Sequence, residues 1–263
     1  MVTTITAIRG ASNDMTPMSS PGEPSEWFAA TITHIVQETP TVKTFVFAMP
    51  HPVHHAAGQH YEIRLTAPDG YQAARLYSAA SVATGKNHLE LTVALMPNGE
   101  VSPYLHHTAT TGTQVEIRGP LGKFFMWDPA STSPVLLISG GSGVVPMRCI
   151  LQAHALAKST TPIHLLYSAR TYSEIIYKNE LLRTHSLADH TTITVTDEKP
   201  LGWHGKTGRI DAALLQEMLD SLPPNPLCYI CGATPFVEAM ANTLVALGIP
   251  AEHIKAERFG ATA

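Results

Sequence analysis

The sequence predicts two domains: an N-terminal six-stranded antiparallel β-barrel of Greek-key type with one capping helix, and a C-terminal α/β domain with a doubly wound, five-stranded parallel sheet. Three observations predict this fold class. Six short strand-like segments lie between residues 28 and 120, strands and helices alternate after residue 135, and a Pro- and Ser-containing stretch at 129–134 separates the two patterns. We expect a mobile tail at 1–25 and domains at 26–130 and 131–263.

The first domain is predicted from runs of β-branched and aromatic residues with short connections between them. The expected strands are 28–37, 42–49, 60–67, 71–81, 88–95 and 113–120. Ser102 and Pro103 are typical of a helix start. Residues 101–108 are therefore expected to form the single helix, which covers one end of the barrel.

The second domain is predicted from apolar runs of strand length that alternate with helical segments. The expected strands are 135–139, 163–169, 191–196, 227–230 and 253–257, and the expected helices are 146–157, 173–182, 210–219 and 235–248. Ligands of such sheets bind beyond the carboxyl ends of the strands. Glycines or polar residues follow four of these ends, at 140–143, 168–170, 196–199 and 231–232.

Composition narrows the function classes. A net charge of −4 gives no basic field for nucleic acid, and no apolar run is long enough to predict a membrane span. Three cysteines are too few for a disulfide framework or for an iron–sulfur cluster, so any cluster must belong to a partner. We expect a cytoplasmic monomer.

The most informative stretch is Val135–Pro146, where a buried strand runs into Gly140, Gly141 and Gly143 before a helix. Glycine allows backbone to approach a ligand closely, and the free N–H groups of a helix start favour an anion. A dinucleotide pyrophosphate fits this description. The spacing differs from the G-x-G-x-x-G fingerprint, so a glycine-rich connection without a ligand stays open.

Arg75, Leu76, Tyr77 and Ser78 end one barrel strand. Alternation places Arg75 and Tyr77 on one face, where a guanidinium can hold a phosphate and a phenol ring can cover a flat ligand. By itself the pattern also fits an exposed strand face.

Two other patterns are open to a redox or metal interpretation. Cys228 and Cys231 spell C-x-x-C, but strand geometry separates them, so a strand residue and a turn residue are the preferred interpretation. Six histidines invite a metal site, yet their spacing fits neither a helix face nor a finger, and we expect no metal. They are His51, His54, His55, His60, His106 and His107.

Taken in order, the motifs GQH, RLYS, GEVS, GPLGKF, GGSGVVP, YSAR, TGRI, CGATPFVEAM and ERF resemble the ferredoxin–NADP reductase superfamily from about Trp27 to Phe259. The resemblance implies that the barrel holds FAD and the α/β domain NAD(P)H. It implies that Arg75 contacts the FAD pyrophosphate and that the neighbouring Leu76 is also a cofactor-binding residue. Tyr77 is then expected to stack on the isoalloxazine and Ser78 to form a hydrogen bond near flavin N5. Gly99 and Ser102 are then the pyrophosphate contacts at the helix start, and Val101 between them is also a cofactor-binding residue.

For the coenzyme, the resemblance implies contacts from Gly140, Gly141, Gly143 and Pro146. It places Cys231 and Gly232 at the nicotinamide ring, with Glu257 and Phe259 as the terminal acid and the aromatic residue that covers the flavin. Residues 260–263 extend beyond the family's end. An extension of this kind can cover the flavin in place of Phe259.

Coenzyme choice shows mixed signals. Ser168, Arg170 and Arg209 occupy positions that in NADPH-preferring relatives lie near the 2′-phosphate, whereas Asp197 repels a phosphate and suits a free ribose hydroxyl. Lys199 and Lys206 are near enough in sequence to compensate. We expect both coenzymes to be used with modest preference.

The resemblance implies an FAD-dependent oxidoreductase that takes a hydride from NAD(P)H and delivers single electrons to a separate ferredoxin, flavodoxin or oxygenase component. Two alternatives stay open. One is a flavin reductase that uses flavin as a diffusing substrate, and the other is an FAD-binding electron-transfer subunit without nicotinamide turnover.

Overall fold

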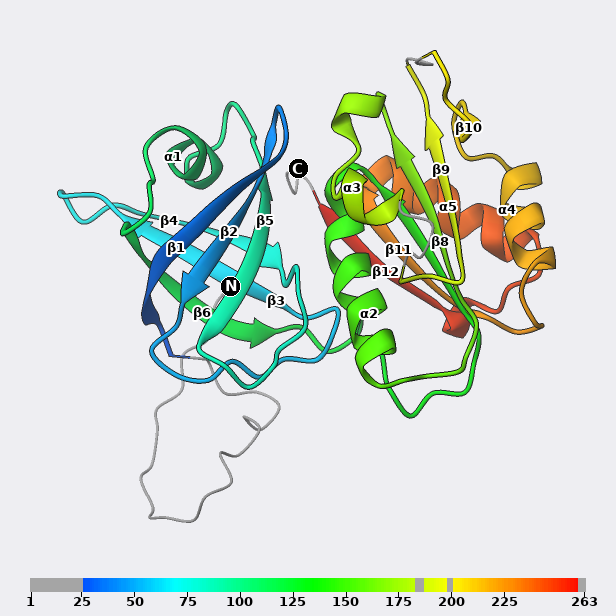
Figure 1. Cartoon of the computed structure of the whole chain (residues 1–263), viewed down its shortest axis with the longest axis horizontal. Helices are drawn as coiled ribbons and strands as arrows, with labels where there is room; N and C mark the ends of the chain where they lie inside the picture. The colour runs from blue at the N-terminus through cyan, green and yellow to red at the C-terminus, as the bar shows by residue number, and fades with distance from the viewer. Residues whose placement is uncertain (1–25, 183–186, 198–200, 260–263) are drawn as a thin grey trace.

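A computed structural model describes residues 26–182, 187–197 and 201–259. The expected tail at 1–25, Lys199 and residues 260–263 lie outside the described residues. The molecule consists of two sheets side by side, with helix α2 (Val144–Leu156) between them (Figure 1).

The N-terminal sheet is antiparallel, as predicted, and its strands lie in the order β4-β3-β6-β1-β2-β5. A bridge between Ala79 and Leu91 joins the two edges and closes the barrel. Helix α1 (Val101–His107) is the expected single helix of this domain. The strands are β1 (Phe28–Thr39), β2 (Val42–Ala48), β3 (His60–Thr66), β4 (Gln72–Ser78), β5 (His88–Ala94) and β6 (Gln114–Leu121).

The C-terminal sheet is parallel and has the order β10-β9-β8-β7-β11-β12. Five of its strands are those predicted; the sixth, β10 (Lys206–Thr207), is a two-residue edge strand whose polar residues carry no strand pattern. The chain reverses direction across the sheet between β7 and β11, which makes their carboxyl ends the switch point where ligands bind in such sheets. The other strands are β7 (Val135–Gly140), β8 (Ile163–Ala169), β9 (His190–Val195), β11 (Leu227–Ala233) and β12 (Ile254–Phe259).

Helices cover both faces of this sheet, as expected of a doubly wound fold (Figure 1). Apolar residues of α2 pack on one face, in a core that continues into the barrel. Residues of α4 (Ala212–Asp220) and α5 (Thr234–Ala246) pack on the other face in a separate core. The two domains therefore share one continuous apolar core.

The helix predicted over 173–182 is wrong in extent. The structure has a 3₁₀ turn at Tyr172–Glu174 and only a short α3 (Lys178–Leu181), and Tyr177 between them has a φ of +56°. Ile175, Ile176 and Tyr177 are all buried, so three consecutive side chains enter the core. A continuous helix cannot bury three consecutive residues on one face.

In the described part of the chain, no helix is both long and apolar enough to span a bilayer.

Candidate functional site

Three residues form a row across the carboxyl ends of the parallel strands. Cys231 on β11 lies in register with Ser139 on β7 at one side and with Glu257 on β12 at the other. Register partners of neighbouring strands point to the same face. The row faces the barrel side of the sheet, since Cys231 belongs to the core shared with the barrel.

The barrel contributes two more residues from the opposite side. His60 begins β3 and is paired in register with Ser78, the last residue of β4. His60 Nδ1 lies 3.2 Å from Glu257 Oε1, so a close polar contact joins the two domains at this point. We call His60, Ser78, Ser139, Cys231 and Glu257 the strand-end cluster.

The strand-end cluster contains polar atoms with no partner. Within the described residues, the hydroxyl oxygens of Ser78 and Ser139 and Oε2 of Glu257 are buried without a hydrogen bond. Leaving such an atom unpaired costs about 1–3 kcal/mol. Three of them in one place indicate a site that a polar ligand completes.

Burial, helped by the nearby Glu257 carboxylate, raises the pKa of the Cys231 thiol well above its usual value. Cys231 is therefore a neutral thiol at physiological pH and a poor nucleophile. Its place in the row suits a residue that contacts and positions a ligand.

The predicted glycines allow β7, α2 and β11 to lie close together, because they have no Cβ. A Cβ at Gly143 would lie 2.0 Å from the Cys231 carbonyl oxygen, and one at Gly232 would lie 2.9 Å from the Phe236 ring. Gly140 has the same ring within 3.2 Å, whereas Gly141 has a φ of +55° and open space around its Cβ position. Gly140, Gly143 and Gly232 thus allow close packing, and Gly141 leaves the turn open to a ligand.

The helix begins two residues before the predicted position. A 3₁₀ turn at Gly141–Gly143 leads directly into α2, whose third residue is Pro146. Proline lacks an N–H, and N–H groups of the first turn have no partner within a helix. Pro146 is buried, so its effect on a ligand is to shape the turn.

Arg75 and Tyr77 lie on the same face of β4, as predicted. The Arg75 side chain is 57% exposed, and its Nη2 lies 3.9 Å from Glu100 Oε2. Leu76 is 53% exposed beside it. Tyr77 is half-buried against the shared core, and this burial raises the pKa of its phenol. Arg75 thus has donors available for an anion, while the ring of Tyr77 is held in place.

Two hydrogen bonds fix the loop that precedes α1 and the first turn of this helix. The Met96 amide donates to Ser102 Oγ at 3.0 Å, and the Gly99 amide donates to the Met96 carbonyl at 2.8 Å. Ser102 and Val101 are buried. The Ser102 hydroxyl keeps its own hydrogen for donation to a ligand.

The loops after β8 and β9 bring the predicted coenzyme-selecting residues together. The Asp197 amide donates to the Arg170 carbonyl at 2.9 Å, and the Gly208 amide before Arg209 donates to the Val195 carbonyl at 2.9 Å. The Arg170 guanidinium pairs with Glu174 at 2.7 Å. Ser168, near the end of β8, is paired in register with Gly140 on β7. Lys206, expected to compensate for Asp197, pairs with Glu217 on α4 instead.

Phe259 ends β12 two residues after Glu257 and packs against the shared core. Cys228 and Cys231 are free thiols whose side chains enter separate cores on opposite faces of the sheet. The redox-pair interpretation of C-x-x-C is therefore wrong.

A second polar group joins the domains away from the predicted site residues. Arg148 on α2 donates to the Ala80 carbonyl at 2.7 Å and to Glu90 Oε2 at 3.1 Å, and its Nε donates to Glu180 at 2.8 Å. The hydroxyl of Tyr177 bonds to that of Thr92. We call Glu90, Thr92, Arg148, Tyr177 and Glu180 the docking cluster.

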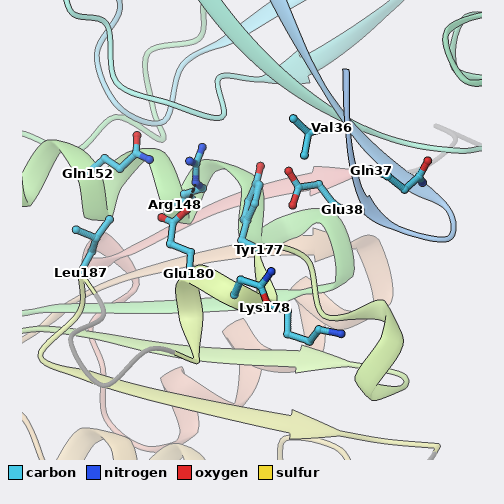
Figure 2. Close-up of a pocket in the computed structure, with 10 residues that line it drawn as sticks. Val36, Gln37, Glu38, Arg148, Gln152, Tyr177, Lys178, Glu180 and Leu187 are labelled. Carbon is cyan, nitrogen blue, oxygen red and sulfur yellow. Dashed lines mark hydrogen bonds and ion pairs between the residues drawn. The ribbon is translucent and has the colours of Figure 1, made fainter. Parts of the chain in front are cut away.

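Figure 2 shows Arg148, Tyr177 and Glu180 of the docking cluster beside Glu38 from the end of β1. They line a cavity of about 520 Å³. A second cavity of about 630 Å³ lies on the barrel beside Glu100 and Tyr71. No residue of the strand-end cluster lines either one.

Sequence reasoning missed two members of the strand-end cluster. Ser139 immediately precedes the glycine turn, which is a local signal for the end of a strand. His60 lies within the motif GQH, but only the pairing of β3 with β4 and the contact between domains bring it to Glu257.

Comparisons with known proteins identify the family to which both domains belong. Residues 29–126 match the family described as oxidoreductase FAD-binding domain, and residues 137–242 match the oxidoreductase NAD-binding domain. The glycine betaine monooxygenase reductase subunit of Chromohalobacter salexigens is 32% identical over 87% of this chain, which spans 63% of that protein's length. The ferredoxin–NADP reductase B of Sorangium cellulosum is 32% identical over 77% of this chain and 84% of its own length.

A solved structure shares the fold. The flavohem-like FAD/NAD-binding domain of nitric oxide dioxygenase from Vibrio cholerae superposes with a TM-score of 0.77 at 24% identity, over 89% of this chain and 99% of that one. The two-domain arrangement found here is thus also that of a protein described as binding both cofactors.

Proposed function

Because this chain belongs to the ferredoxin–NADP reductase superfamily, with an FAD-binding and an NAD-binding oxidoreductase domain, we propose that it moves a hydride from NAD(P)H to bound FAD and passes single electrons to a separate redox protein. One observation carries the proposal. Ser78, Ser139 and Glu257 leave buried oxygen atoms unpaired where the two domains meet. A ligand with N–H and O–H groups satisfies these atoms, and both flavin and nicotinamide amide groups have such donors.

The cofactors fit the residues present. Arg75 supplies an exposed guanidinium for the FAD pyrophosphate, and Ser102 supplies a hydroxyl donor at the start of α1. Tyr77 supplies a ring held by the core. On the other domain, the open turn at Gly141 accepts the coenzyme.

Flavin, when bound, supplies the chemistry that links a two-electron donor to one-electron acceptors. The chain's residues orient the reactants and exclude water. Cys231 presents a neutral thiol and Glu257 a carboxylate oxygen beside it, while Ser78 offers a hydroxyl from the barrel. We assign Phe259, which ends β12 two residues after Glu257 and packs against the shared core, to covering the flavin. Holding the two reactants in one geometry removes much of the entropic barrier to their reaction.

The electron acceptor is proposed from the relatives of this chain. The names of two relatives refer to a monooxygenase and to a ferredoxin. On these names we propose a ferredoxin or an oxygenase component as the acceptor of this chain, and the sequence resemblance adds a flavodoxin.

Purification and acceptor assays test the proposal. We expect a yellow protein with FAD bound, which oxidises NAD(P)H and reduces a ferredoxin, flavodoxin or oxygenase component in single-electron steps. Release of FAD on simple gel filtration, with turnover only when flavin is added, would identify the flavin reductase alternative. FAD retention without NAD(P)H oxidation would identify an electron-transfer subunit.

A further inference from the structure

We propose that His60 is a positioning residue of the hydride-transfer site: it holds Glu257 across the domain boundary and thereby fixes the carboxylate beside Cys231. The inference rests on the proposed function because it concerns the same site. It adds a barrel residue to a group that was predicted from the C-terminal domain and Ser78.

The first argument is the register of four strands. His60 and Ser78 are opposite each other on β3 and β4, and Cys231 and Glu257 are beside each other on β11 and β12. The contact between His60 Nδ1 and Glu257 Oε1, at 3.2 Å, connects these two pairs. Both side chains are less than one-fifth exposed, so solvent screens the contact only partly.

The second argument is the confinement of the imidazole ring. Gly122 follows β6 with a φ of +91°, and a Cβ there would lie 2.9 Å from Cε1 of His60. The Gly122 carbonyl accepts a hydrogen bond from Gln59 Nε2 at 2.9 Å, which ties this loop to β3. The ring is therefore close to both the Gly122 backbone and the Glu257 carboxylate.

This confinement has a consequence for Glu257. With Oε1 held by His60, the buried Oε2 is the oxygen left for another donor. The partner of Oε1 comes from the barrel, so the orientation of the carboxylate depends on the closed arrangement of the domains. His60 thus makes assembly of the site conditional on domain contact.

Three variants separate positioning from general structure. His60→Phe keeps a ring and removes the nitrogen that contacts Glu257. His60→Asn restores an amide nitrogen near the place of Nδ1 and serves as the conservative rescue. His88→Phe is the matched control, because His88 Nε2 lies 3.1 Å from Glu90 Oε1 in a similar pair that stays within β5.

Stopped-flow reduction of the FAD-loaded chain by NAD(P)H is the first measurement. We expect His60→Phe to lower the limiting rate about tenfold while the coenzyme dissociation constant changes less than about twofold. His60→Asn recovers most of the rate, and His88→Phe retains the wild-type rate. Combining His60→Phe with Glu257→Gln should slow reduction no further than the slower single variant, since His60 is proposed to act only through the Glu257 carboxylate. Wild-type speed in His60→Phe, or effects that multiply in the double variant, overturns the proposal.

A second measurement needs neither turnover nor a His60 variant. In ¹H–¹³C spectra of the full chain, Glu257→Gln should shift the ring signals of His60 and leave those of His88 in place. Unmoved His60 signals overturn the proposed pair even where wild-type reduction is normal. Wild-type protein that takes up FAD but is not reduced by NAD(P)H contradicts the proposed function instead, whatever these signals do.

Discussion

The docking cluster and the strand-end cluster both join the barrel to the α/β domain. They differ in whether their buried polar atoms have hydrogen-bond partners. In the docking cluster, Arg148 is bonded to Glu90, Glu180 and the Ala80 carbonyl. Among the described residues, no buried side-chain atom of that cluster lacks a partner, whereas three in the strand-end cluster do.

The difference separates two tasks within one interface. A buried hydrogen-bond network in which every polar atom has a partner stabilises the contact between two surfaces. A buried network with unpaired polar atoms is destabilising until a ligand supplies the missing partners. Burial disfavours the charge of Arg148, but Tyr177, Glu180 and Glu90 outweigh this effect and raise the pKa of the guanidinium. We therefore expect substitutions in the docking cluster to affect stability and substitutions in the strand-end cluster to affect rate.

The largest expected effect is on stability. Arg148→Ala leaves Glu90 and Glu180 without their cation and should lower the free energy of unfolding by about 3 kcal/mol. Urea denaturation followed by fluorescence measures this. Lys206→Ala is the control, because the Lys206–Glu217 pair is exposed and should contribute less than about 1 kcal/mol. Equal losses in the two variants would remove the docking role of Arg148.

Next in size is the loss of FAD. Arg75→Ala removes a charged donor for the pyrophosphate, and a charged hydrogen bond contributes about 1.5–3 kcal/mol, so the FAD dissociation constant should rise about tenfold to a hundredfold. Fluorescence titration of flavin-free protein measures it. Arg118→Ala, which removes a barrel arginine paired with Glu62, should leave FAD affinity unchanged. Binding of riboflavin should not respond to Arg75→Ala.

A smaller effect, confined to rate, is expected in the strand-end cluster. Cys231→Ala and Glu257→Gln should each slow flavin reduction at least about tenfold, or about 1.4 kcal/mol in barrier height, with FAD still bound. Cys228→Ala is the control on the opposite face of β11 and should lower stability without changing the rate. Stopped-flow traces at wild-type speed for both cluster variants would exclude them from the site.

The smallest effect concerns coenzyme choice. Asp197→Arg removes a carboxylate and adds a cation beside the Arg170 loop, so it should shift the ratio of kcat/KM values toward NADPH. The wild-type protein should use both coenzymes with modest preference. A wild-type preference beyond about a thousandfold, or about 4 kcal/mol, would contradict the assignment of Asp197 to the phosphate site.

Much of the fold follows from local pattern. The alternation in β1 to β6 and the apolar runs of β7, β8, β9 and β11 are strong because each strand buries a regular set of side chains. The interrupted helix before α3 could not be predicted locally, since Tyr177 turns inward to reach Thr92 of the other domain. The strand β10 depends on hydrogen bonds to β9 and has no pattern of its own.

The residues of the site likewise fall into those that the sequence predicts and those that only the packed structure reveals. Cys231 and the glycines at 140–143 lie at strand ends, where ligands of parallel sheets bind, so the sequence alone predicts a site there. His60 and Ser139 were missed because their importance depends on which atoms remain unpaired after the domains pack. Arg148, which holds the domains together, lies on a helix whose sequence gave no signal for a contact with Glu90.

Anaerobic titration of the purified, FAD-loaded chain with NADH, and separately with NADPH, tests the central claim most directly. The account predicts that about one equivalent of either coenzyme removes the absorbance of the oxidised flavin, since one hydride carries the two electrons that FAD accepts. Flavin that stays oxidised in excess NADH and excess NADPH would contradict the claim that the strand-end cluster is a hydride-transfer site.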